Sequence, residues 1–198
     1  IYQINLAIAG IAVGTVSLPA LSKAFKNRNI KKLSNIQSKS FELSLLLSIP
    51  ASLGLILASE EIINSLFGYG SFSEKDVKQT ADALKYFGYG VPAFALVKIL
   101  SNFFFARDNT KTPLYISISM VIINISISVS LFESYGFIII PIATSISTWV
   151  GVLIYIYLLN KKNSLLLNKE LIPNFIKILG STIIMSIMMV LLINNYET

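Results

Sequence analysis

The chain has 198 residues, of which 54% are apolar and only 13% are charged, with a formal net charge of +6. Soluble domains of similar apolar content carry about 25% charged residues, so the missing charge argues against an ordinary soluble fold. The absence of cysteine and histidine excludes disulfides, thiol catalysis, histidine acid–base chemistry and zinc-type sites within these residues. We therefore expect no metal and no cofactor.

Apolar stretches recur along the chain, each close to the roughly 20 residues that an α-helix needs to cross a bilayer. Six such spans are predicted, at residues 1–22, 41–59, 83–106, 113–132, 137–159 and 173–193. The sequence thus predicts an all-α fold, a polytopic membrane helix bundle with six transmembrane helices.

Local signals refine three of these spans. Pro50 predicts a kink or tilt in the second span. The third is expected to begin earlier, with Ser73 as N-cap and Asp76 at the third helical position, and to bend near Pro92. The fourth, YISISMVIINISISVS, alternates with the period of a β-strand. A bilayer admits only helices and closed barrels, and the neighbouring spans are too long for barrel strands, so we predict a helix.

The segments between the spans alternate in charge. Residues 23–39 hold six basic and no acidic residues, 107–112 two basic and one acidic, and 160–172 three lysines and one glutamate, whereas residues 59–82 are predominantly acidic. The positive-inside rule places the three basic segments in the cytoplasm and both Ile1 and Thr198 outside. Because Phe25 is the only aromatic residue among the basic residues of the first segment, membrane phospholipids are the expected partner and nucleic acid is not.

Lys98 lies within the third span, about 13 Å from Arg107 at a rise of 1.5 Å per residue. Helical side chains lean toward the helix N-terminus. Here that direction leads away from the nearer membrane surface, the basic one at Arg107, so the Lys98 side chain is poorly oriented to snorkel to it. A lysine near the membrane centre costs at least about 2.5 kcal/mol and usually faces an interior or a water-filled cavity. We predict that Lys98 faces such a cavity, with Asn102 one turn further on the same face; snorkelling is the alternative.

Polar residues of the fourth span offer a second set of candidates. Ser117, Asn124 and Ser128 share one helix face, and Asn124 is predicted to line the same cavity as Lys98. The alternative is hydrogen bonding between helices, which is the usual role of serine in membrane spans.

Two further pairs have simpler explanations. Gly10 and Gly14 are predicted to pack closely against another helix, because small residues four apart allow backbones to approach. Arg107 and Lys111 are predicted to form a basic mouth on the cytoplasmic side, although the orientation rule alone also accounts for them.

Four ordered segments then carry a family resemblance: GIAVGTVSLPALSK (10–23), IPASLGLILASEEIINSLFGYGSF (49–72), VPAFALVKIL (91–100) and FFFARDNTKTP (103–113). Together they resemble the MurJ/MviN family of lipid II flippases, of the MATE-like (MOP) superfamily. The resemblance implies a fourteen-helix, two-lobed transporter of the bacterial cytoplasmic (inner) membrane, of which this chain resembles helices eight to thirteen. The chain is therefore expected to be an internal fragment, with a missing N-terminal lobe as its partner.

The resemblance also implies a substrate and a division of the chain. The substrate would be an undecaprenyl-pyrophosphate-linked disaccharide-peptide lipid, moved from the inner to the outer leaflet without enzymatic chemistry. Residues 1–159 would supply five helices of the C-terminal lobe. Residues 160–198 would supply a cytoplasmic loop and one helix of the C-terminal helix pair.

Other functions stay open at this point. Within the transporter class, the alternatives are an exporter of another lipid-linked oligosaccharide and a cation-coupled drug transporter. A non-transporting membrane scaffold would tolerate loss of the Lys98 charge. A membrane-embedded transferase would use the carboxylates of Glu60 and Glu61, but ordinary solvated loop charge also explains them.

Overall fold

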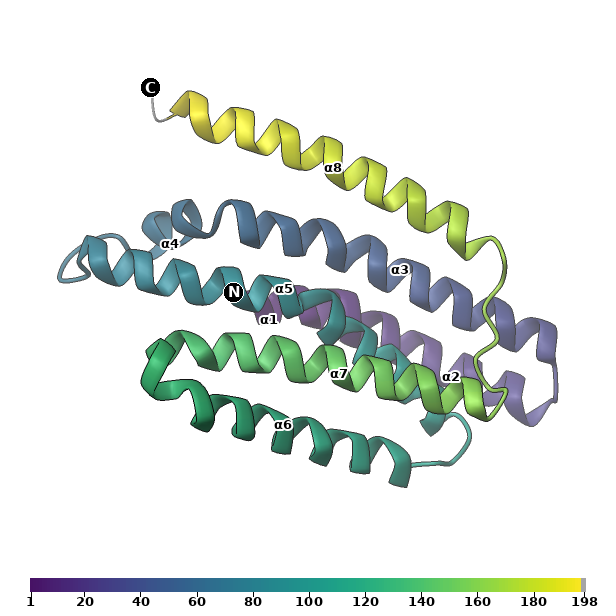
Figure 1. Ribbon diagram of the computed structural model, residues 1–198. Helices are drawn as coiled ribbons and strands as arrows, with labels where there is room; N and C mark the ends of the chain where they lie inside the picture. Colours follow the sequence, from purple (N-terminus) through teal and green to yellow (C-terminus); the bar gives the residue numbers. More distant parts are fainter. Residues whose placement is uncertain (197–198) are drawn as a thin grey trace.

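The computed structural model describes residues 1–196 as a bundle of long helices that run back and forth along one axis (Figure 1). The helices are α1 (Tyr2–Leu6), the π-helix η1 (Ala7–Ala12), α2 (Val13–Lys26), α3 (Ile30–Leu57), α4 (Ser59–Phe67), α5 (Glu74–Phe105), α6 (Lys111–Tyr135), the 3-10 helix η2 (Gly136–Ile138), α7 (Ile139–Lys161) and α8 (Leu171–Tyr196). Thr198, one of the two predicted outer ends, lies outside the described residues.

The predicted all-α membrane bundle is confirmed. Five stretches of the described chain are long and apolar enough to cross a membrane, and one of them, Lys111–Lys161, contains both α6 and α7. These two helices form a hairpin (Figure 1), so the six predicted spans each correspond to a helical segment. The fourth span is helical despite its strand-like alternation, because a lipid-exposed strand would leave backbone groups unpaired.

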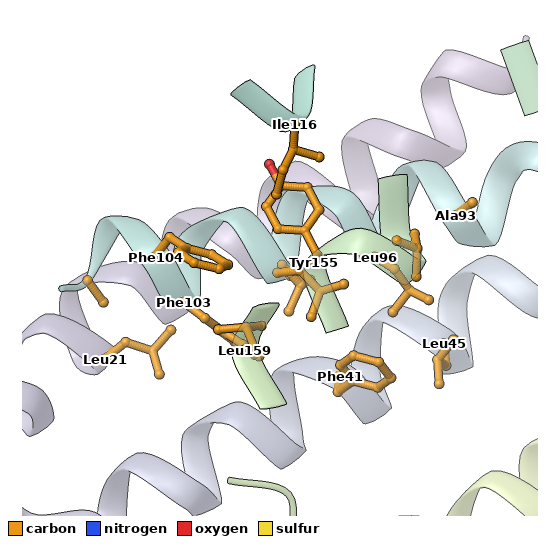
Figure 2. Close-up of a cluster of buried hydrophobic side chains, with 14 of the residues drawn as sticks. Leu21, Phe41, Leu45, Ala93, Leu96, Phe103, Phe104, Ile116, Tyr155 and Leu159 are labelled. Atoms are coloured by element: carbon orange, nitrogen blue, oxygen red, sulfur yellow. The ribbon is translucent and has the colours of Figure 1, made fainter. Parts of the chain in front are cut away.

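Helix α5 occupies the middle of the bundle, between α3 and α7, while α6 and α8 lie at opposite edges (Figure 1). Its side chains Phe103 and Phe104 are almost fully buried and pack with Leu21, Phe41 and Tyr155 from α2, α3 and α7 (Figure 2). Within lipid such contacts stabilise mainly through close packing, because the tails outside are equally apolar. Among the described residues, helix α8 packs on α3 and on no other helix.

Local chemistry sets where two helices begin. Helix α5 starts after Ser73, whose side chain accepts from the Asp76 amide while the Asp76 side chain accepts from the Ser73 amide, so the predicted capping arrangement is confirmed. Helix α3 starts at Ile30 because the Asn29 side chain accepts from the Lys32 amide at 2.9 Å. The expectation that residues 23–39 form a loop is therefore wrong. Hydropathy detects the apolar part of a helix and misses its polar extension.

Pro92 interrupts the hydrogen bonding of α5 without ending the helix. Because proline has no N–H, the carbonyl of Gly88 lacks its intrahelical donor. The buried hydroxyl of Ser52 on α3 donates to that carbonyl at 2.7 Å. On the other side, Ser145 and Trp149 of α7 donate to the carbonyls of residues 86 and 89. The central helix is thus fixed to both neighbours at its proline.

Candidate functional site

Lys98 lies at a hollow between the first span, α5 and α6. The hollow, of about 430 Å³, is called here the Lys98 hollow and is lined by Gly10, Ile11, Gly14, Thr15, Leu18, Val97, Lys98, Ser101, Asn102, Phe105, Pro113 and Ser117. The Lys98 side chain is exposed, while the residues that follow it, Ile99 and Leu100, are fully buried. A cation therefore stands at an open cavity seven residues from the end of α5.

Two hydroxyls of the Lys98 hollow already donate within their own helices. Ser101 bonds to the carbonyl of Lys98 at 2.9 Å, and Thr15 bonds to the carbonyl of Ala12 at the same distance. No acidic side chain in the described part of the chain forms an ion pair with Lys98. The ammonium is thus free to interact with an anion, and the hydroxyl oxygens keep lone pairs that can accept from a polar ligand.

Asn102 and the two glycines lie beside Lys98. The Asn102 amide donates to the carbonyl of Gly14 at 2.8 Å, joining α5 to α2. A side chain at Gly14 would meet that amide, because a Cβ placed there lies 2.9 Å from Asn102 Nδ2. Gly10 lies in the π-helix η1, a local widening that is frequent at functional sites. Gly14 therefore allows α2 to approach α5 at Asn102, and both glycines line the hollow.

The structure places Asn124 away from the Lys98 hollow. Its amide donates to the hydroxyl of Thr144 at 2.9 Å, across the interface between α6 and α7. Of Ser117 and Ser128, the two residues predicted to share the face of Asn124, Ser117 lines the hollow and Ser128 does not. Asn124 thus takes part in hydrogen bonding between helices, which was the alternative to lining the cavity of Lys98.

Arg107 and Lys111 do not form a single mouth. Arg107 donates to the carbonyls of Phe103 and Ser164 and stacks 5.5 Å from the centre of the Phe25 ring. Partial burial lowers the pKa of its guanidinium, whose ordinary value is so far above neutral pH that the group stays charged. Lys111 is an exposed residue in the first turn of α6. Neither residue lines the Lys98 hollow.

Sequence reasoning missed the polar contacts that hold residues 162–170 on α3. Gln37, which is fully buried, donates to the carbonyl of Ser164 and accepts from the amide of Leu166, while Ser38 accepts from the amide of Asn168. These residues are about 130 positions apart, so no local pattern could have revealed the pairing. The available signal was a polar residue, Gln37, within a basic stretch of the sequence.

Comparison with known proteins gives consistent matches. The sequence model of the family described as "Lipid II flippase MurJ" matches residues 1–198. A "Probable lipid II flippase MurJ" of Rickettsia prowazekii is 40% identical over 158 residues, which cover 79% of this chain and 31% of the relative. One of the same description from Rhizobium tropici is 33% identical over 197 residues, covering 100% of this chain and 37% of the relative.

A solved structure has the same fold. The chain titled "Lipid II flippase MurJ, inward closed conformation" aligns with a TM-score of 0.83 and 26% identity, over 96% of this chain and 38% of that one. The present chain spans about a third of the length of the curated relatives it matches. Its helices therefore correspond to one part of a larger transporter fold.

Proposed function

Because the chain belongs to the lipid II flippase MurJ family, we propose that it forms part of a transporter that moves lipid II, the undecaprenyl-pyrophosphate-linked peptidoglycan precursor. The direction would be from the inner to the outer leaflet of the bacterial cytoplasmic membrane. The observation that carries this proposal is Lys98, an exposed cation at a hollow in the middle helix of a membrane bundle.

A pyrophosphate headgroup needs such a cation on its way across. Moving an unpaired charge into a medium of low dielectric constant is very costly, so the protein must supply a compensating charge. Lys98 is itself expensive to place in a membrane, which favours a functional reason for its presence. The hydroxyls and amide around it offer hydrogen bonds to the sugars next to the pyrophosphate.

We propose that the missing N-terminal lobe covers the open side of the Lys98 hollow and that the two lobes rock to expose it alternately to each leaflet. Residues 1–159 form five helices of the C-terminal lobe in this proposal. Residues 160–198 contribute a cytoplasmic loop and one helix of a C-terminal pair. In the described part of the chain α8 packs on α3 and on no other helix, and its exposed apolar face supports a peripheral position for that helix.

The choice of substrate is tested with the complete protein reconstituted in liposomes. Labelled lipid II is compared with a lipid that carries the same undecaprenyl pyrophosphate but a different oligosaccharide, and with a cationic drug. We expect lipid II to cross at least tenfold faster than either competitor. Equal or faster movement of the second lipid would favour an exporter of other lipid-linked oligosaccharides, and movement of the drug alone would favour a drug transporter.

A further inference from the structure

Helices α2, α5 and α7 end at the same end of the bundle in the same backbone turn. In each, an amide bonds to the carbonyl five residues earlier: Asn29 to Ala24 at 3.0 Å, Asn109 to Phe104 at 3.1 Å and Ser164 to Leu159 at 2.8 Å. The residue before each amide has a positive φ: Arg28 at 52°, Asp108 at 54° and Asn163 at 49°. This is the Schellman termination, which normally uses glycine at that position.

A residue other than glycine in this conformation costs roughly 1–2 kcal/mol, less for asparagine and aspartate. Arginine lacks the short polar side chain of asparagine and aspartate, so the positive φ of Arg28 is an outlier that needs a structural or functional explanation. The three turns surround a common space, so a side chain at these positions reaches a place that glycine would leave empty. The position of Arg28 therefore indicates that its side chain has a role in the space between the turns.

The space between the turns is a cavity of about 630 Å³, called here the three-turn cavity. Three cations line it, Lys26, Arg28 and Arg107, together with a single carboxylate, that of Asp108. Part of its wall is apolar, formed by residues that include Phe25, Leu33 and Leu166. The cavity thus combines an excess of two positive side-chain charges with an apolar surface.

The cations of the three-turn cavity differ in how firmly they are held. Arg107 is fixed by its bonds to the carbonyls of Phe103 and Ser164 and by the Phe25 ring, and its guanidinium has five N–H donors, more than those bonds use. Among the side chains that the structure describes, none forms a hydrogen bond or an ion pair with the side chain of Lys26 or Arg28. One cation is therefore positioned in advance, and two are free to close on a ligand.

We propose that the three-turn cavity binds a phosphate group, with Arg107 as the fixed ligand and Lys26 and Arg28 completing the site. Arginine suits phosphate because its planar donors match two phosphate oxygens at once. The same chemistry is offered by the headgroup of an anionic phospholipid and by a soluble phosphate compound.

The charge balance favours the lipid. Each helix C-terminus contributes a partial charge of about −0.5, so the three ends oppose most of the excess positive charge of the side chains. A free phosphate ion would accordingly bind weakly. A phospholipid is already concentrated at the ends of the membrane spans and also gains from contact with the apolar wall. We therefore expect a headgroup of the leaflet at the basic end to occupy the cavity.

The proposal is tested with the complete protein in neutral-lipid nanodiscs, titrated with phosphatidylglycerol and, separately, with inorganic phosphate. The cavity variant is Lys26→Gln with Arg28→Gln. The matched control is Lys31→Gln with Lys32→Gln, which removes the same charge from the neighbouring turn of α3 but not from the cavity lining. We expect the cavity variant to bind phosphatidylglycerol at least tenfold more weakly and the control less than twofold. Thermal unfolding of both variants verifies that they are folded.

The outcomes separate the two sources of phosphate. Saturable binding of phosphatidylglycerol that millimolar inorganic phosphate does not displace identifies a lipid headgroup. Binding of inorganic phosphate alone, lost in the cavity variant, identifies a soluble phosphate compound. Equal weakening in the cavity and control variants would overturn the proposal, because the basic surface as a whole would then be responsible. So would an absence of saturable binding by either probe.

Discussion

Replacement of Lys98 by glutamine should reduce the transport of lipid II by the complete protein at least tenfold, while insertion and abundance stay the same. A hydrogen bond to a charged group contributes about 1.5–3 kcal/mol, and 1.4 kcal/mol corresponds to a factor of ten. Because the Lys98 side chain is exposed at the hollow, its replacement disturbs no buried packing. The rate is measured with labelled lipid II in proteoliposomes.

Two control variants are needed to interpret the transport rate of Lys98→Gln. Lys98→Arg keeps the charge and is expected to retain most of the rate. Lys75→Gln removes an equally exposed lysine from the first turn of the same helix and should have no effect. Normal transport by Lys98→Gln at equal protein density would remove Lys98 from the mechanism and revive the scaffold interpretation.

Replacement of Arg107 by alanine should lower the free energy of unfolding by about 2–4 kcal/mol. The substitution leaves two carbonyls, those of Phe103 and Ser164, without a charged donor and removes the contact with Phe25. The charged hydrogen bond to Ser164, worth about 1.5–3 kcal/mol, and the cation–π contact with Phe25, worth about 0.5–1 kcal/mol, together account for a loss of this size. The change is measured by chemical unfolding of the complete protein in detergent.

The contribution of the guanidinium geometry of Arg107 to the free energy of unfolding can be separated from that of its charge. Arg107→Lys keeps the charge but loses the planar pair of donors, so most of the destabilisation should persist. Lys111→Ala removes an exposed charge four residues away and should change stability by less than about 0.5 kcal/mol. If Arg107→Ala were as stable as the wild type, the junction between α5 and residues 162–170 would not depend on this side chain.

The sequence was sufficient for those features that depend on neighbouring residues. Hydropathy located six spans because every crossing helix must be apolar over its own length. The start of α5 followed from Ser73 and Asp76, whose side chains bond within one turn. Helical spacing likewise placed Lys98 and Asn102 together, and the Lys98 hollow contains both.

Features that depend on residues far apart along the chain could not be predicted from the sequence. Asn102 and Gly14 were singled out separately, and only the fold brings them into hydrogen-bond contact across 88 positions. Asn124 has a polar partner on α7 that helical spacing along α6 does not reveal. The three-turn cavity joins residues of three separate turns, each of which alone has the appearance of an ordinary charged helix end.

Depletion of the complete protein in its host, followed by measurement of lipid II in each leaflet, shows whether this chain belongs to a transporter of lipid II. We expect accumulation in the inner leaflet and loss from the outer leaflet, with restoration by the wild-type gene and not by Lys98→Gln. An unchanged distribution after depletion would contradict it, and the export of a different lipid-linked oligosaccharide would then be the function to examine.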